Sequence, residues 1–420
     1  MNAGILITLG VFFFLLAFFI SLWLRRIPTV LSFTRQHHVR LYFNEETTVT
    51  LTINYRSGIP CHWLQYSERL PLALGYSKPF QGVLYIPGHS QQTLHYTIRG
   101  TRRGIFQLGP LTVQYGDLFG FATRRLRSSS IDYVIVYPKV IPLDELLLPS
   151  RTPLGTVRSR NPLSEDPLRV IGVRDYQSGD SIRNVHWRAT ARVGSLQVKK
   201  LEPAMTLETI IVLDVHPELY DSLYLQEYRE LAIVTAASFA HALLDARQAV
   251  GLLSNGQQSP LLSQAYTSSS SSTVPAWSSD IGRSTTSSLP NAHTPITPKP
   301  VLQHAITVPA ARGNTQLLHI LETLAALEPT ETITLLDLLN HHTHGLGWGT
   351  TIVVISGNIT EALTAKLIAI QHAGYRVLYI TIGGRHASAR LGGTLSTDAI
   401  PVFRIRNEEQ LIASTEAFHG

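Results

Sequence analysis

The sequence has very little cysteine and no motif of nucleotide chemistry. Cys61 is the single cysteine in 420 residues, which excludes an intrachain disulfide and a cysteine-rich metal site. No G-x-x-x-x-G-K-[ST] or G-x-G-x-x-G accompanies the pair Gly383 and Gly384, so we do not expect nucleotide binding by this chain. The basic residues are dispersed without a long Lys/Arg run, although the net charge is +6. We therefore expect no cofactor and no nucleic-acid partner.

Charge is absent near the N-terminus. Gly4 to Leu24 carry no charged residue and are rich in Leu, Ile and Phe, and Trp23 closes the run. A helix of this length rises about 30 Å, the thickness of a hydrocarbon core. The alternative is a cleaved signal peptide, but no charged segment precedes the run and no small-x-small site follows it. We predict a transmembrane helix over residues 4–24.

The charges that follow this helix predict its orientation. Arg25, Arg26, Arg35 and Arg40 all precede the first acidic residue, Glu45. Because basic residues stay on the cytoplasmic side, we expect a single-pass protein of the cell membrane with the bulk of the chain in the cytoplasm.

Two further regions have different periodicities. Over residues 36–140 apolar and polar residues alternate between closely spaced turns, which predicts a β-sandwich of immunoglobulin-like architecture. Over residues 204–253 and 301–420 short apolar runs alternate with helical segments, which predicts a doubly wound, mostly parallel α/β sheet. Residues 254–300 between these two parts are rich in Ser, Thr and Pro, and we predict a disordered insertion there. The expected fold class is α+β and multidomain, and residues 141–203 form an Arg-rich connector.

The connector contains a dense block of special residue types. It resembles the signature of the family called domain of unknown function 58, written R-x-Y-x-x-G-D-x-x-R-x-I-x-W-x-x-[ST]-A-R. The matching residues are Arg174, Tyr176, Gly179, Asp180, Arg183, Trp187, Thr190, Ala191 and Arg192. Val185 stands where the signature has isoleucine.

A second stretch is similar to the same family. Arg102-Arg103-Gly104-Ile-Phe-Gln-Leu-Gly-Pro110, with Asp117-Leu-Phe-Gly120 after it, follows the pattern R-R-G-x-[YF]-x-L-G-P … D-x-F-G. The resemblance implies a C-terminal domain like that of von Willebrand factor type A. It also implies a partner, a MoxR-type AAA+ ATPase, and a role in the assembly or maturation of other complexes. Members often carry two N-terminal spans, whereas one is visible here.

Physical reading of the signature favours structure or docking over chemistry. Gly179 and Asp180 form a turn pair, and Asp180 is within reach of Arg183 or Arg192 for a bidentate pair. Trp187 offers a large buried or stacking face. The block is therefore either a polar network that ties the connector to the α/β domain or a basic docking face for an acidic partner. An active site built on Asp180, His186 and Arg192 would lack a nucleophile of known motif.

A metal site is conceivable at one strand end only. Asp214 follows the first α/β strand, where von Willebrand type A domains often hold Mg²⁺ with a D-x-S-x-S loop. His216 and Glu218 occupy the two serine positions, and Ser356-Gly357-Asn358 stands where a further acidic residue is usual. Thr315 remains a candidate threonine ligand. We expect a vestigial site, and we read His341, His342 and His344 as solvated loop residues.

These observations predict a membrane-anchored adaptor or scaffold that is not an enzyme. Its partners would be an ATPase of the MoxR type and an unidentified client protein. The competing hypothesis is a metal-dependent adhesion or ligand-binding receptor exposed outside the cell.

Overall fold

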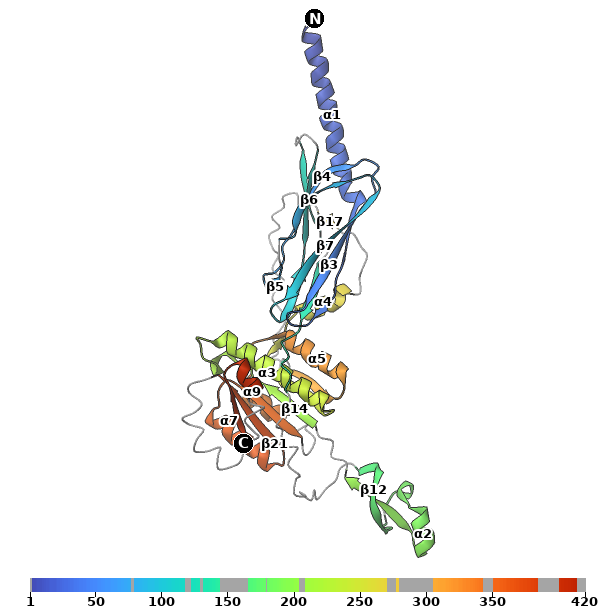
Figure 1. Ribbon diagram of the computed structural model, residues 1–420, viewed down its shortest axis with the longest axis vertical. Coiled ribbons are helices and arrows are strands. Elements are labelled where there is room, and N and C mark those ends of the chain that lie inside the picture. The colour runs from blue at the N-terminus through green and yellow to red at the C-terminus, as the bar shows by residue number, and fades with distance from the viewer. Residues whose placement is uncertain are drawn as a thin grey trace, which may run out of the picture.

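The computed structural model describes residues 2–76, 79–117, 122–128, 131–143, 165–178, 180–203, 208–269, 277–278, 305–342, 350–383 and 400–413. It is a mixed α and β structure. An apolar helix leads into two packed antiparallel sheets, which rest on a unit with a six-stranded sheet (Figure 1). A two-stranded arm, β12 and α2 in Figure 1, extends away from both.

The N-terminal helix α1 (Asn2–Val30) is long and apolar enough to cross a membrane, with a mean hydropathy of 2.5 over its apolar stretch. It is longer than the span predicted at 4–24, because its last turns are part of the sandwich core. Leu24 and Ile27 are fully buried against the sheets. Which side of a membrane the chain occupies stays a prediction.

Two antiparallel sheets pack face to face beneath α1. The first has the order β1-β3-β7-β5 and the second β17-β10-β9-β4-β6. Their strands are β1 (Leu31–Gln36), β3 (Glu46–Tyr55), β4 (Cys61–Glu68), β5 (Leu74–Gly75), β6 (Gln81–Ile86), β7 (Ser90–Gly100), β9 (Leu111–Gly116), β10 (Thr123–Ser128) and β17 (Trp277–Ser278). The alternation read from the sequence holds, since Val49, Leu51 and Ile53 are buried in a core shared with Leu64 and Val113. The immunoglobulin-like topology remains a prediction.

The α/β unit contains a mostly parallel sheet with the order β18-β15-β14-β20-β21-β22, in which β18 is the antiparallel edge. The strands are β14 (Glu208–Leu213), β15 (Ala249–Ser254), β18 (Ile306–Ala311), β20 (Thr351–Ser356), β21 (Arg376–Ile382) and β22 (Val402–Ile405). Helices α3 (Leu225–Asp245) and α5 (Asn314–Ala325) share a core with Ile211 and Leu213. Helices α6 (Leu335–His342) and α7 (Glu361–His372) pack with Ile210 and Val212. These two residues alternate along β14 with Ile211 and Leu213 and so point to the other face of the sheet. Helices therefore cover both faces of this sheet.

The sandwich and the α/β unit also share a core. A third sheet, of β2 (Arg40–Leu41), β11 (Asp132–Val136) and β8 (Gly104–Leu108), supplies Ile105, Tyr133 and Ile135 to the same cluster as α3 and α5. The two units are thus packed together.

Part of the segment predicted as a disordered insertion, residues 254–300, is folded, which corrects that prediction for the described residues. Strand β16 (Gln257–Gln258) pairs with β19 (Leu327–Glu328), and helix α4 (Leu261–Ser269) follows. Leu262 and Ala265 are buried in the shared core, so this helix has the apolar side that the later Ser/Thr/Pro-rich sequence lacks. Residues 270–276 and 279–300 lie outside the described residues.

Candidate functional site

The signature block forms a small arm, which we call the signature arm and define as residues 165–178 and 180–203. Strands β12 (Glu165–Asp175) and β13 (Gln197–Pro203) pair in antiparallel fashion. Between them lie a 3-10 turn, η1 (Ile182–Asn184), and helix α2 (Trp187–Val193). Val185 forms a bridge with Val198, and both side chains are buried. The apolar group that replaces isoleucine in the signature is therefore the small core of the arm.

Asp180 pairs with Arg174, which is a correction to the predicted partners Arg183 and Arg192. The two guanidinium nitrogens lie 2.6 and 2.7 Å from the two carboxylate oxygens. The backbone N–H of Gln177 donates to the same carboxylate at 2.9 Å. These hydrogen bonds lower the pKa of Asp180 to about 2, and those from Arg174 have the largest effect. The pair fixes the turn after β12; Gly179 lies outside the described residues.

His186 and Thr190 are occupied with local structure. The Nδ1 atom of His186 accepts from the N–H of Ala189 at 3.1 Å and so caps α2. The hydroxyl of Thr190 accepts from the N–H of Gln197 at 3.0 Å, which joins α2 to β13. Asp180 and His186 thus stabilise the fold of the arm. Each is hydrogen-bonded to its own local partner, so the geometry does not support an acid–base pair of these two residues.

The outer surface of the signature arm is apolar and basic at once. Trp187 is 65% exposed, and Ile182, Val193, Leu196 and Tyr176 are exposed as well. Of the two alternatives for Trp187, a buried face or a stacking face, the structure does not show the buried one. Residues 172–200 contain six Lys or Arg and two Asp, and both carboxylates are engaged within the arm, Asp175 by Gln197. Arg183, Arg188 and Arg192 are exposed.

The second candidate site lies at the carboxyl edge of the six-stranded sheet. The chain runs outward from β14 to β15 and then returns to β20, so the strand order reverses between β14 and β20. Ligands of open α/β sheets bind at such a reversal. Asp214 follows β14 there and is completely buried.

Protein donors already surround the carboxylate of Asp214. One oxygen accepts from Asn255 Nδ2 at 2.8 Å and from the N–H of His216 at 3.1 Å. The other oxygen accepts from the Ser356 hydroxyl at 2.9 Å. Burial raises the pKa of Asp214 against the opposing effect of these bonds. Tyr220, whose hydroxyl donates to the Asp214 carbonyl at 2.5 Å, is buried beside it.

This arrangement does not fit a bound Mg²⁺. The carboxylate has no exposed oxygen, and β18 runs antiparallel, so Thr315 after it lies at the opposite edge of the sheet from Asp214. Across the described residues no cluster of three His, Cys, Asp or Glu side chains suits a metal ion. Asn255 was not singled out from the sequence; its place directly after β15, at the same edge as Asp214, is the signal that points to it.

Two other sequence features have structural explanations. His341 and His342 are not loop residues but end α6, and His344 lies outside the described residues. Gly383 has a φ of 76°, and a Cβ atom there would come within 2.8 Å of the Tyr228 ring. Close packing against α3 thus explains this glycine without a phosphate.

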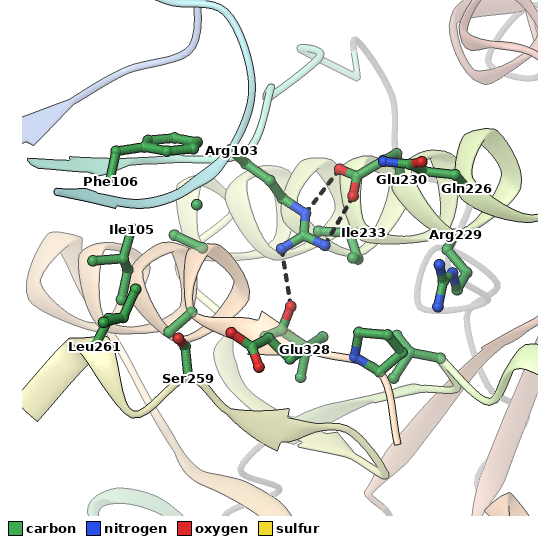
Figure 2. A pocket seen from close by; sticks show the side chains of 16 residues that line it. Arg103, Ile105, Phe106, Gln226, Arg229, Glu230, Ile233, Ser259, Leu261 and Glu328 are labelled. Carbon is green, nitrogen blue, oxygen red and sulfur yellow. Dashed lines mark hydrogen bonds and ion pairs between the residues drawn. The ribbon is translucent and has the colours of Figure 1, made fainter. Parts of the chain in front are cut away.

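Arg103, from the second motif, joins the sandwich to the α/β unit. Its guanidinium forms two bonds of 2.8 and 2.9 Å with Glu230 on α3. It also donates to the carbonyl of Leu324 in the last turn of α5 at 2.9 Å and to that of Leu327 in β19 at 3.1 Å. Arg103 lines a cavity of about 300 Å³, and Figure 2 shows its guanidinium directed at the Glu230 carboxylate. Sequence reasoning assigned no role to this residue, and its contacts are all distant in the chain.

Comparison with known proteins supports the resemblance over part of the chain. The model of a family described as "Protein of unknown function DUF58" matches residues 172–272. The uncharacterized protein YeaD of Bacillus subtilis (strain 168) is 23% identical over 224 residues, which are 52% of this chain and 54% of that protein. The chain therefore spans about half the length of this curated relative.

Solved structures match about a quarter of the chain. They include a complex of zinc 2-glycoprotein and prolactin inducible protein from human seminal plasma, with 11% identity and a TM-score of 0.21 over 25% of this chain and 92% of that chain. A CARDB domain from Pyrococcus furiosus, with 8% identity and a TM-score of 0.19, covers 25% of this chain and 91% of that chain. Scores this low carry no structural or functional argument.

Proposed function

We propose that this chain is a membrane-anchored adaptor that binds a partner protein through the signature arm and performs no catalysis itself. The observation that carries the proposal is the composition of the arm surface, where a largely exposed Trp187 lies among exposed arginines. Tryptophan and arginine are the residue types most enriched at the energetic centres of protein interfaces.

The chemistry of the arm favours an acidic partner with an apolar pocket. Within residues 172–200 six basic residues outnumber two acidic ones, and both aspartate side chains are bonded within the arm. The resemblance to the family implies that this partner is a MoxR-type AAA+ ATPase, which would supply the ATP hydrolysis that this chain has no motif for. The client would be a second protein, bound elsewhere on the chain.

The rest of the fold suits such a scaffold. We propose that the α/β unit is of the von Willebrand type A kind, because its strand order with one antiparallel edge fits that architecture, and that the sandwich is immunoglobulin-like. We further propose that α1 anchors the chain in the cell membrane with its bulk in the cytoplasm. A metal-dependent adhesion receptor is the weaker candidate, since the carboxylate it would need, on Asp214, is buried and bonded to the protein.

The test is capture of the full chain from solubilised membranes, with and without ATP. The wild type is expected to retain an AAA+ ATPase, and Trp187→Ala is expected to reduce the retained amount at least about tenfold, as for the loss of an interface centre. Tyr224→Ala removes an aromatic side chain that is 50% exposed but lies outside the arm, and it should bind as the wild type does. Retention of the ATPase by Trp187→Ala at the wild-type level, or no ATPase with the wild type in either condition, would refute the proposal.

A further inference from the structure

Helix α1 is attached rigidly to the end of the sandwich. No linker separates it from β1, because Val30 ends the helix and Leu31 begins the strand. Leu24 and Ile27 are buried among the strands. The backbone N–H of Arg56, in the loop after β3, donates to the Val30 carbonyl at 2.9 Å.

One hydrogen bond from the sandwich completes this junction where Pro28 interrupts the hydrogen bonding of the helix. Pro28 has no N–H, so the carbonyl of Leu24 four residues earlier lacks its usual helical donor. The hydroxyl of Tyr115 on β9 donates to that carbonyl at 3.1 Å. Tyr115 is itself fully buried, so the sandwich supplies the donor that the helix lacks.

The length of the free part of α1 then places the sandwich against the bilayer. The roughly 20 residues ahead of Trp23 rise about 30 Å, which is the thickness of the hydrocarbon core. The boundary of the hydrocarbon therefore falls near Trp23, where the helix meets the strands (Figure 1). The end of the sandwich beside α1 therefore lies at the level of the lipid headgroups.

The chemistry of this end matches an anionic lipid surface. Arg25, Arg26 and Arg56 are exposed around the junction, and Ile59, in the same loop as Arg56, is 55% exposed. Asp117 is the acidic residue of the sandwich at this end, and its side chain is buried and bonded to the N–H of Ala122 at 2.7 Å. The other acidic side chains of residues 31–143 lie near the end of β1 or the start of β3: Glu45, Glu46, Glu68 and Asp132.

We infer that this end of the sandwich, made of Arg25, Arg26, Arg56 and Ile59, is a lipid-contact surface that rests in an anionic headgroup layer and holds the whole chain at a fixed height above the membrane. Arginine side chains near such a surface are attracted by its negative potential, and Ile59 is placed to enter the polar boundary. The inference rests on the membrane anchoring in the proposed function. It adds that the fold itself, and not the helix alone, contacts the bilayer.

The test measures quenching of a fluorophore by nitroxide lipids in vesicles that contain the full chain. Single cysteines are introduced by Ile59→Cys and by Leu72→Cys, an 88% exposed residue at the other end of the sandwich beside β5. Phe14→Cys, 72% exposed within α1, reports insertion of the helix. The native Cys61 does not interfere, because it is fully buried and burial raises the pKa of its thiol to about 11.

Headgroup nitroxides are expected to quench the label at position 59 severalfold more strongly than the label at position 72. The difference should be larger in phosphatidylcholine vesicles that contain phosphatidylserine, and Arg56→Gln should reduce this gain. Equal quenching at positions 59 and 72, with the label at position 14 quenched by acyl-chain nitroxides, would overturn the inference and leave the anchor intact. An unquenched label at position 14 would overturn the anchor and the inference together.

Discussion

Removal of the Arg103 side chain should weaken the junction between the sandwich and the α/β unit. Removal of the exposed Arg102 side chain should not. The side chain of Arg103 is 12% exposed and that of Glu230 is 44% exposed. The ion pair is therefore partly screened by solvent and contributes under about 1 kcal/mol. The carbonyls of Leu324, in the last turn of α5, and Leu327, in β19, each lose a charged donor, which costs about 1 kcal/mol each. We expect Arg103→Ala to lower the free energy of unfolding by about 2–3 kcal/mol.

The assay is thermal or denaturant unfolding of the detergent-solubilised chain, with hydrogen exchange resolved along the sequence. Arg103→Ala should lower the midpoint and increase exchange in α3 and at the end of α5, on both sides of the cavity in Figure 2. Arg102→Ala removes the same charge from an exposed position and should leave both measurements unchanged. If the two variants shift the midpoint equally, the assignment of Arg103 as the connection between the units is refuted.

Three further predictions concern single groups. Tyr115→Phe leaves the Leu24 carbonyl buried without its donor and should cost about 1–3 kcal/mol in denaturant unfolding, whereas Tyr137→Phe, whose hydroxyl has no partner among the described residues, should cost nothing. The raised pKa of Asp214 means that the folded chain holds this proton more tightly than the unfolded chain, so its contribution to stability is greatest in acid and is lost as the pH rises through the raised pKa. Asp214→Asn should remove that decline from a series of midpoints against pH, and Mg²⁺ should shift neither protein. The lowered pKa of Asp180 has the opposite sign: its contribution is present above the ordinary pKa and is lost as the pH falls through about 2, a transition in arm exchange that Asp180→Asn should abolish.

The signature block illustrates how far spacing alone can lead. The motif predicts Asp180 as a turn residue paired with Arg183 or Arg192, and the partner in the structure is Arg174 instead. Spacing does not show which arginine Asp180 meets, because that depends on where β12 ends and how the turn bends back. The exposure of Trp187 likewise depends on whether another element covers the arm.

Local patterns by themselves determined the elements of this protein. The uncharged run to Leu24, the alternation around Leu51 and the apolar strand ahead of Asp214 each predict a structure that the chain adopts, because burial and backbone hydrogen bonding act on neighbouring residues with a fixed period. The extension of α1 into the sandwich core and the burial of α4 depend instead on packing against elements distant in the sequence.

Tertiary structure decided every contact between groups distant in the sequence. Arg103 meets Glu230, Tyr115 completes the helix at Leu24, and Asn255 takes an oxygen of Asp214. No period or motif spacing encodes these pairs, since each depends on which faces of separate elements bury apolar surface against each other. The sequence thus specifies the parts, and packing specifies which polar groups meet between them.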